Sequence, residues 1–192
     1  ISYYVRGSWR GFFALHRPED FAVIADALRS FRPTRSVELG TAAGGFSAFL
    51  ADTVAEWGGH LLTTDVKRDS VAPEVGFEDS TVDRLIATTP NLTFLEADTL
   101  TAPHPTVTAW ICTPGSFLYA DDGDKECELR IYAPHVGPGG VIGCHDYGSE
   151  VDTEVAAEIM ALNGFEPFRH AEFEALAGPG YPISMTRLWR RP

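Results

Sequence analysis

The feature that most constrains the fold is a short apolar strand that runs directly into a glycine-rich turn and then into a helix. We predict the strand over residues 36–40, the turn from Gly40 to Gly45, and the helix over 45–57. Glycines let the backbone turn sharply at a strand end and leave a surface on which a ligand can lie closely. Glu38 places a carboxylate just before the turn. This charge disfavours a phosphate and favours a positively charged ligand.

The rest of the chain alternates between strands and helices. Alternating elements predict an α/β fold with a doubly wound, mostly parallel seven-stranded sheet, Rossmann-like in type. The last two strands have no full helix between them, which predicts a terminal antiparallel hairpin. The period-two pattern of the last strand is typical of a half-exposed edge strand. Helices are predicted at 18–31, 79–88, around Trp110, at 125–134 and at 150–162, and further strands at 60–65, 92–97, 116–120, 141–145, 165–173 and 182–190.

Length and composition indicate one domain. The chain has 192 residues, of which 44% are hydrophobic, and this is enough for a single α/β core. We predict a single domain over 17–192 and an N-terminal arm over 1–16. The arm is rich in aromatic residues and irregular in pattern. It is either a lid over a pocket or a packed arm, and its aromatic side chains can form core or dimer contacts in a homo-oligomer.

The net charge and the cysteines indicate which classes of partner the protein can have. The net charge of −12 argues against nucleic acid, whose phosphates require basic surfaces. No apolar run approaches the roughly 18 residues that span a bilayer. Three cysteines form no CxxC pair, and we interpret them as buried thiols in a reducing compartment. These observations predict a cytoplasmic protein without a membrane or nucleic-acid partner.

Acidic residues recur at the predicted strand ends, and the carboxyl ends of parallel strands meet at one edge of a sheet. Any single acid in a turn can be a helix cap or a solvated charge. An acid after the second strand can accept hydrogen bonds from ribose hydroxyls. Acids after the fourth and fifth strands would face each other, and oxygen ligands of this kind suit Mg²⁺. The acids are Glu38, Asp65, Asp98, Asp121, Asp122, Asp124 and Asp146.

These residues resemble a known family. The stretch from Glu38 to Ser47 resembles motif I of the class I S-adenosylmethionine (SAM)-dependent methyltransferases. Asp122-Gly123-Asp124, the stretch 128–140 with its Pro-Gly-Gly, and His145-Asp146-Tyr147 resemble the branch of cephalosporin-hydroxylase-like proteins and macrocin-type sugar O-methyltransferases. The resemblance covers roughly residues 18 to 150.

The resemblance implies SAM as cofactor and Mg²⁺ as a further ligand. It implies that Glu38 lies near the ammonium group of SAM, Asp65 near the ribose and Asp98 beside the adenine. Lys125 departs from the family pattern, because it stands where a histidine is usual. The implied cofactor-binding residues are Glu38, Gly40, Thr41, Ala42, Gly44, Gly45, Asp65 and Asp98. The implied metal ligands are Asp122, His145 and Asp146, and the catalytic candidates are His145, Lys125 and Asp122, with His145 or Lys125 as base.

The sequence therefore predicts SAM-dependent methyl transfer to the hydroxyl of a small-molecule acceptor, assisted by a divalent ion. Two alternatives stay open. The first is a non-catalytic domain of the same fold that binds a cofactor or a partner. The second is a nicotinamide-dependent oxidoreductase, which the absence of a GxGxxG spacing weakens. The acceptor pocket is expected from segments 1–16, 66–80 and 171–181, and the histidines other than His145 are expected to be structural or on the surface.

Overall fold

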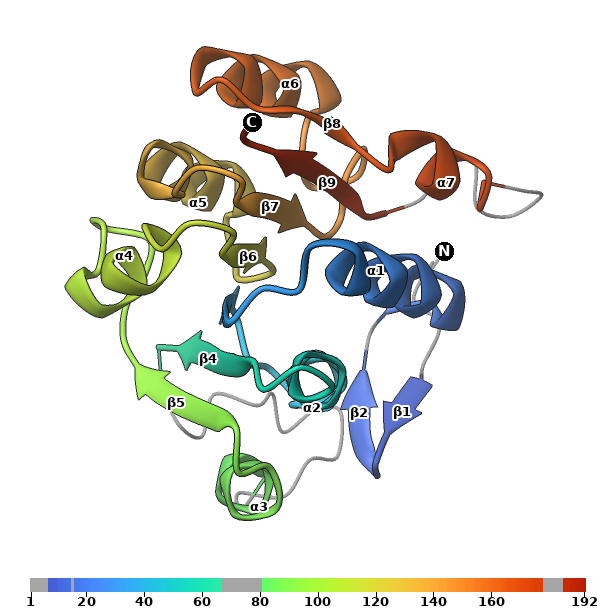
Figure 1. Cartoon of the computed structure of the whole chain (residues 1–192), viewed down its shortest axis with the longest axis vertical. Coiled ribbons are helices and arrows are strands. Elements are labelled where there is room, and N and C mark those ends of the chain that lie inside the picture. The colour runs from blue at the N-terminus through green and yellow to red at the C-terminus, as the bar shows by residue number, and fades with distance from the viewer. Residues whose placement is uncertain (1–6, 15, 67–80, 178–184) are drawn as a thin grey trace.

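A computed structural model describes residues 7–14, 16–66, 81–177 and 185–192. Its main feature is a seven-stranded sheet with the order β5-β4-β3-β6-β7-β9-β8 (Figure 1). Neighbouring strands from β5 to β7 are parallel, and β9 is antiparallel to both β7 and β8. The predicted sheet and its terminal hairpin are confirmed. The strands are β3 (Arg35–Leu39), β4 (His60–Asp65), β5 (Leu92–Glu96), β6 (Phe117–Ala120), β7 (Val141–Cys144), β8 (Glu166–Phe168) and β9 (Arg187–Arg190).

Helices cover both faces of this sheet. Helices α1 and α2 lie on one side, and α4 and α5 lie on the other (Figure 1). None of the helices in the described ranges combines the length and the apolar character that crossing a bilayer requires. The helices are α1 (Pro18–Phe31), α2 (Gly45–Ala55), α3 (Thr81–Thr88), α4 (Pro105–Ile111), α5 (Lys125–Tyr132), α6 (Thr153–Leu162) and α7 (His170–Glu174).

Local signals explain where helix α1 begins and ends. Pro18 occupies the first turn, where its missing N–H leaves no hydrogen bond unmade. Glu19 and Asp20 add negative charge at the positive end of the helix dipole. The helix stops at Arg32, which is left-handed and donates its backbone N–H to the carbonyl of Leu28. The predicted range 18–31 is confirmed.

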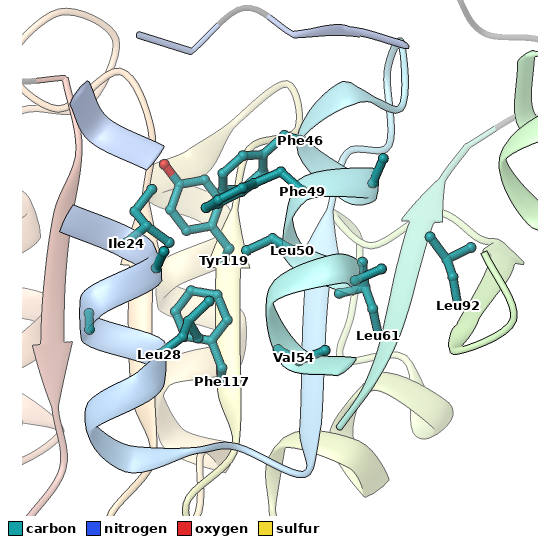
Figure 2. Close-up of a cluster of buried hydrophobic side chains, with 14 of the residues drawn as sticks. Ile24, Leu28, Phe46, Phe49, Leu50, Val54, Leu61, Leu92, Phe117 and Tyr119 are labelled. Atoms are coloured by element: carbon teal, nitrogen blue, oxygen red, sulfur yellow. The ribbon is translucent and has the colours of Figure 1, made fainter. Parts of the chain in front are cut away.

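The core lies on both faces of the sheet because side chains alternate along each strand. On β6, Phe117 and Tyr119 belong to one cluster, and Leu118 belongs to the other. In the first cluster, Ile24 of α1 and Phe49 of α2 lie around these two rings (Figure 2). Fully burying one side chain of this kind contributes about 2 kcal/mol. The two clusters fix the helices against the sheet and hold the strand ends in register.

The N-terminal arm differs from the expected irregular segment. Strands β1 (Gly7–Trp9) and β2 (Phe12–Ala14) form an antiparallel hairpin. The hairpin packs against α2, and Phe13 forms a parallel bridge with Gly44 in the turn after β3. Trp9 packs edge-on against Phe49 and donates its indole N–H to Asp52. The arm is thus packed onto the domain, while Tyr3 and Tyr4 lie outside the described residues.

Two further expectations are corrected. The last strand was expected at the sheet edge, yet β9 lies between β7 and β8, and Trp189 on it is buried. The strand expected over 165–173 is limited to β8, because helix α7 follows at once. The cysteines were expected to be buried, but Cys112 is exposed and Cys127 is half-buried, which leaves Cys144 as the buried thiol. Of the expected acceptor segments, residues 67–80 and 178–181 lie outside the described residues, whereas residues 171–177 are described and include the end of α7.

Candidate active site

A cavity of about 190 Å³ lies where the strand order reverses between β3 and β6. Ligands of doubly wound sheets bind at such a switch point, beyond the carboxyl ends of the strands. The turn after β3 forms one wall, and the charged residues after β6 and β7 form another. Phe13, Ala14 and His16 close the cavity from the arm. A larger cavity of about 540 Å³ between the hairpin, α1 and α2 is mostly apolar and adjoins the smaller one at His16.

The glycines of the turn allow the chain itself to approach closely. A Cβ at Gly40 would lie 2.5 Å from the carbonyl oxygen of Asp121, and one at Gly45 would lie 2.2 Å from that of Phe13. Both distances are too short for any side chain. Ala42 adopts a left-handed backbone with φ of 42°. The turn is therefore shaped by its contacts with β6 and the arm, and its remaining surface faces the cavity.

The predicted cofactor residues divide into two groups. Six of them line the cavity: Glu38, Gly40, Thr41, Ala42, Gly44 and Gly45. Within this group, Thr41 turns its hydroxyl inward to the carbonyl of Thr64. Asp65 and Asp98 lie outside the lining. Asp65 is buried and accepts a hydrogen bond from the backbone N–H of Ala42, whereas Asp98 is exposed and accepts one from Leu100.

Glu38 is fully buried below the turn. Its Oε2 accepts hydrogen bonds from the hydroxyl of Ser47 and, at 2.6 Å, from that of Thr63. Its Oε1 has no partner among the described residues. Burial raises the pKa of Glu38 to about 8, although the two hydroxyl donors oppose this shift. The site thus holds a carboxyl group that a cationic ligand would help to ionise.

Asp121 stands where Asp122 was expected. Side chains alternate along β6, so Asp121 shares the face of Tyr119, and Asp122 turns away. The Oδ1 of Asp122 accepts from the backbone N–H of Gly123, and its own N–H donates to Glu128. Within the described ranges, the metal-ligating group whose ligand atoms all lie within 4.8 Å is His16, Asp121 and His145. The expected set of Asp122, His145 and Asp146 is not gathered.

His16 was expected to be structural or exposed, but it lies at the centre of the site. The residue is 3% exposed, and its ring stacks between Phe46 and His145, with centroid distances of 4.0 and 4.1 Å. Its Nε2 lies 3.3 Å from Oδ2 of Asp121. Burial, and then the positive charges of His145 and Lys125, lower the pKa of His16 well below its usual value. The ring is therefore neutral.

Lys125 begins α5 and points into a group of carboxylates. Its Nζ lies 3.0 Å from Oδ2 of Asp146 and 2.9 Å from Oε2 of Glu150. Burial acts to lower the pKa of Lys125, but these carboxylates and Asp121 outweigh it and raise the pKa above its ordinary value. Burial acts in turn to raise the pKa of Asp146, but His145 and Lys125 outweigh it and lower the pKa to about 2.

His145 joins the two carboxylates after β6 and β7. Its Nδ1 lies 3.3 Å from Oδ1 of Asp121 and 3.4 Å from Oδ2 of Asp146. Burial acts to lower the pKa of His145, but the Asp121 and Asp146 carboxylates outweigh it and raise the pKa to about 10. His145 is therefore an imidazolium at neutral pH. The left-handed backbone of Asp146, with φ of 55°, aims its carboxylate at both cations.

Comparison with known proteins identifies the fold. No protein-family model matches this sequence, and comparison with curated proteins gives no match. A structure of CmcI with Mg and SAM matches with a TM-score of 0.67 and 17% identity, covering 97% of this chain and 77% of that one. A SAM-dependent O-methyltransferase from Thermotoga maritima matches with a TM-score of 0.59 and 15% identity, over 91% and 65% of the two chains.

The chain has the class I methyltransferase fold. The sequence resemblance is thus confirmed at the level of the fold. The [4+2]-cyclase SpnF also matches, with a TM-score of 0.52 and 12% identity over 97% of this chain and 86% of that one. Since a cyclase shares this methyltransferase fold, the reaction must be argued from the site.

Sequence reasoning missed three residues of the site in this methyltransferase fold. Asp121 was passed over in favour of its neighbour, and only the strand alternation that places Tyr119 could have separated them. Glu150 follows Asp146 by four residues in the turn after β7, where its backbone N–H donates to the carbonyl of Asp146, and this short spacing is a usable signal. His16 had no local signal, because its contacts with Asp121 and His145 join segments far apart in the chain.

Proposed function

We propose that this protein transfers a methyl group from SAM to a hydroxyl oxygen of a small molecule. One observation supports the proposal most directly. The glycine turn after β3 and the charged groups after β6 and β7 line the same cavity, in a fold that SAM-dependent O-methyltransferases also have. A concave site with a cavity of about 190 Å³ suits a small acceptor better than a macromolecule.

The cavity offers a partner for the ammonium group of SAM. Glu38 Oε1 is buried and unpartnered among the described residues, and Glu38 is one of the residues that line the cavity. A positive charge beside this oxygen would favour the carboxylate. In this proposal the turn from Gly40 to Gly45 holds the methionine part, Asp65 accepts from the ribose hydroxyls and Asp98 lies beside the adenine. Bound SAM would carry a methyl group on a positively charged sulfur. An oxygen nucleophile would take this methyl group as its bond to the sulfur breaks.

The charged residues act on the acceptor oxygen. Lys125 and His145 carry positive charge at neutral pH because their pKa values are raised. A protonated side chain has no lone pair that could accept the hydroxyl proton. We therefore replace the base role predicted for His145 or Lys125 with the role of a cation. Both stabilise the negative charge that develops on the oxygen. Asp121, whose pKa burial raises, takes the proton.

Magnesium does not fit the ligands that the resemblance implies. Asp122 lies apart from the other two, and His145 offers nitrogen to an ion that prefers oxygen. The third ligand, Asp146, already holds the ammonium of Lys125 at 3.0 Å. Asp122 therefore leaves the proposed catalytic set, and no step of the proposed reaction runs through a metal ion.

The proposal includes the setting of the protein. A cytoplasmic protein without a nucleic-acid partner agrees with three free cysteines and a net charge of −12. We keep the division into an arm over residues 1–16 and a single domain over 17–192. His16, the last residue of the arm, lines the cavity and so connects the arm to the proposed site. A homo-oligomer stays a prediction, which analytical ultracentrifugation of the purified protein would test.

Isothermal titration calorimetry with S-adenosylhomocysteine (SAH) tests the function without knowledge of the acceptor. We expect SAH to bind at one site and NAD not to bind. Glu38→Gln should weaken SAH binding by about tenfold or more, since a charge-assisted contact with the ammonium is lost. Glu96→Gln, at an exposed position on β5, is the matched control and should bind SAH like the wild type.

Two other outcomes of this titration would support the alternative functions. Binding of NAD in place of SAH would support the oxidoreductase alternative. Binding of neither ligand by folded protein would contradict the methyltransferase and support a partner-binding domain.

A further inference from the structure

Lys125 brings a fixed positive charge into the cavity. Its side chain is 7% exposed, and its ammonium contacts Asp146 and Glu150 at 3.0 and 2.9 Å. An ammonium has three N–H donors. Two of them serve these carboxylates, and the third has no partner among the described residues. Because Lys125 lines the cavity, this third donor is available to an oxygen of a bound ligand.

The ammonium and a divalent ion would compete for the same carboxylate. Oδ2 of Asp146 contacts Nζ of Lys125, and it also lies 3.4 Å from Nδ1 of His145. The other oxygen, Oδ1, is buried and has no partner within the described ranges. An ion on Oδ1 would lie within a few ångströms of the ammonium, since the two oxygens belong to one carboxylate. The repulsion between the ion and the ammonium is strong at that distance, because a buried site screens charges less than water does.

The charges around Lys125 are already close to balance. Three carboxylates, those of Asp121, Asp146 and Glu150, face the two cations Lys125 and His145. A divalent ion added to this group would reverse the sign of its net charge. An ion that displaced Lys125 would leave a buried ammonium without its partners, which is strongly unfavourable.

A second group of ligands has a different preference. His16, Asp121 and His145 present two nitrogens and one oxygen. Such a set suits zinc or iron and not magnesium. Each oxygen of Asp121 already lies 3.3 Å from an imidazole nitrogen. A metal ion bound by this group would be an alternative to Lys125 as the source of positive charge in the cavity. Metal-binding measurements on the wild-type protein can test this alternative.

We propose that Lys125 is the resident cation of this cavity, in place of the divalent ion that the sequence resemblance implies, and that its third N–H binds the acceptor oxygen. The second part rests on the proposed function. The first part concerns this chain alone. It requires that the wild-type protein binds no divalent ion here, and that removal of the ammonium creates a binding site for one.

The test measures Mn²⁺ by electron paramagnetic resonance, because Mn²⁺ takes the same oxygen ligands as Mg²⁺. The wild-type protein should leave Mn²⁺ free. Lys125→Met keeps the length of the side chain without its charge, and this variant should bind one Mn²⁺ about tenfold or more tightly than the wild type. Arg130→Met removes an exposed cation from the same helix and should behave like the wild type.

Three results would overturn the proposal. One is binding of one Mn²⁺ by the wild-type protein, a measurement that needs no variant and so decides even where Lys125→Met does not fold. Another is binding of Zn²⁺ by the wild type that is lost in His16→Ala. The last is an unchanged Mn²⁺ affinity in folded Lys125→Met.

Titration of SAH separates this inference from the proposed function. The wild-type protein should bind SAH with the same affinity in EDTA and in Mg²⁺. Binding of SAH that requires Mg²⁺ would contradict the inference and support the function. Failure of SAH to bind would contradict the function and leave the Mn²⁺ result standing.

Discussion

The carboxyl ends of β6 and β7 differ sharply from those of β4 and β5. At the first pair, Asp121, His145 and Asp146 are largely buried, and each charged group contacts another. At the second pair, Asp98 is exposed and bonds only to nearby backbone, and Asp65 bonds to the turn. Burial of a charge requires a partner within the protein, whereas an exposed acid keeps its oxygens for a ligand. The end at β6 and β7 is therefore assembled in advance, whereas at the other end Asp98 stays exposed.

The largest expected effect concerns Glu38, which lies on β3 between these two ends. Its pKa is about 8 in the folded protein against an ordinary 4.5. The folded state therefore binds the proton more tightly than the unfolded state does, and stability falls as pH rises from about 4.5 to 8. The difference of about 3.5 pH units, at 1.36 kcal/mol per unit, corresponds to a loss of about 5 kcal/mol.

Urea unfolding between pH 5 and 9 measures this loss. The Glu38→Gln variant should lack the Glu38 part of the slope, so the difference between the two curves isolates this residue. Parallel curves would show that Glu38 ionises in the folded state as easily as in water. In that case the carboxyl of Glu38 would behave like the exposed carboxyl of Asp98.

A second prediction compares one carboxylate from each end. Asp121→Asn leaves Lys125 and His145 with less compensation, and removal of one partner from a buried pair costs about 3 kcal/mol. Asp98→Asn alters an exposed group and should change the free energy of unfolding by less than about 0.5 kcal/mol. Equal effects, measured by urea unfolding at pH 7, would erase the contrast between the two ends.

The smallest effect concerns the close approach of the arm. Gly45→Ala brings a Cβ against the carbonyl of Phe13, and overpacking of this kind costs about 2 kcal/mol. In Gly123→Ala, the Cβ would meet only Leu100 at 4.0 Å, so this variant is the control. Thermal unfolding compares them, and limited proteolysis follows the arm. A stable Gly45→Ala with a protected arm would mean that the hairpin does not need this contact.

Local patterns predicted much of the fold, and contact between distant segments explains the rest. Alternating apolar strands and helices indicated the parallel sheet, and Pro18 marked the start of α1. The interior position of β9 was missed, because a period-two pattern does not say which neighbours a strand will have. The hairpin of the arm was missed because its strands have only three residues each.

Part of the candidate site was also predictable from the sequence. The turn after β3 and the residues Lys125, His145 and Asp146 follow from their positions at strand ends, and all line the cavity. The choice between Asp121 and Asp122 depends on a single step of strand alternation. The ion pair of Lys125 with Asp146 depends on side-chain geometry, which spacing alone does not give.

The contacts of His16 with Tyr119 and His145, which lie more than a hundred positions later, have a consequence for how the protein is made. A ribosome adds about 5–20 residues per second, so the hairpin exists for on the order of ten seconds before Asp121 and His145 emerge. During that interval His16 has neither Asp121 nor His145 to contact. The pocket is therefore among the last parts of the nascent chain to be completed, and a fragment that stops before β7 would lack His145, Asp146 and Glu150 from its lining.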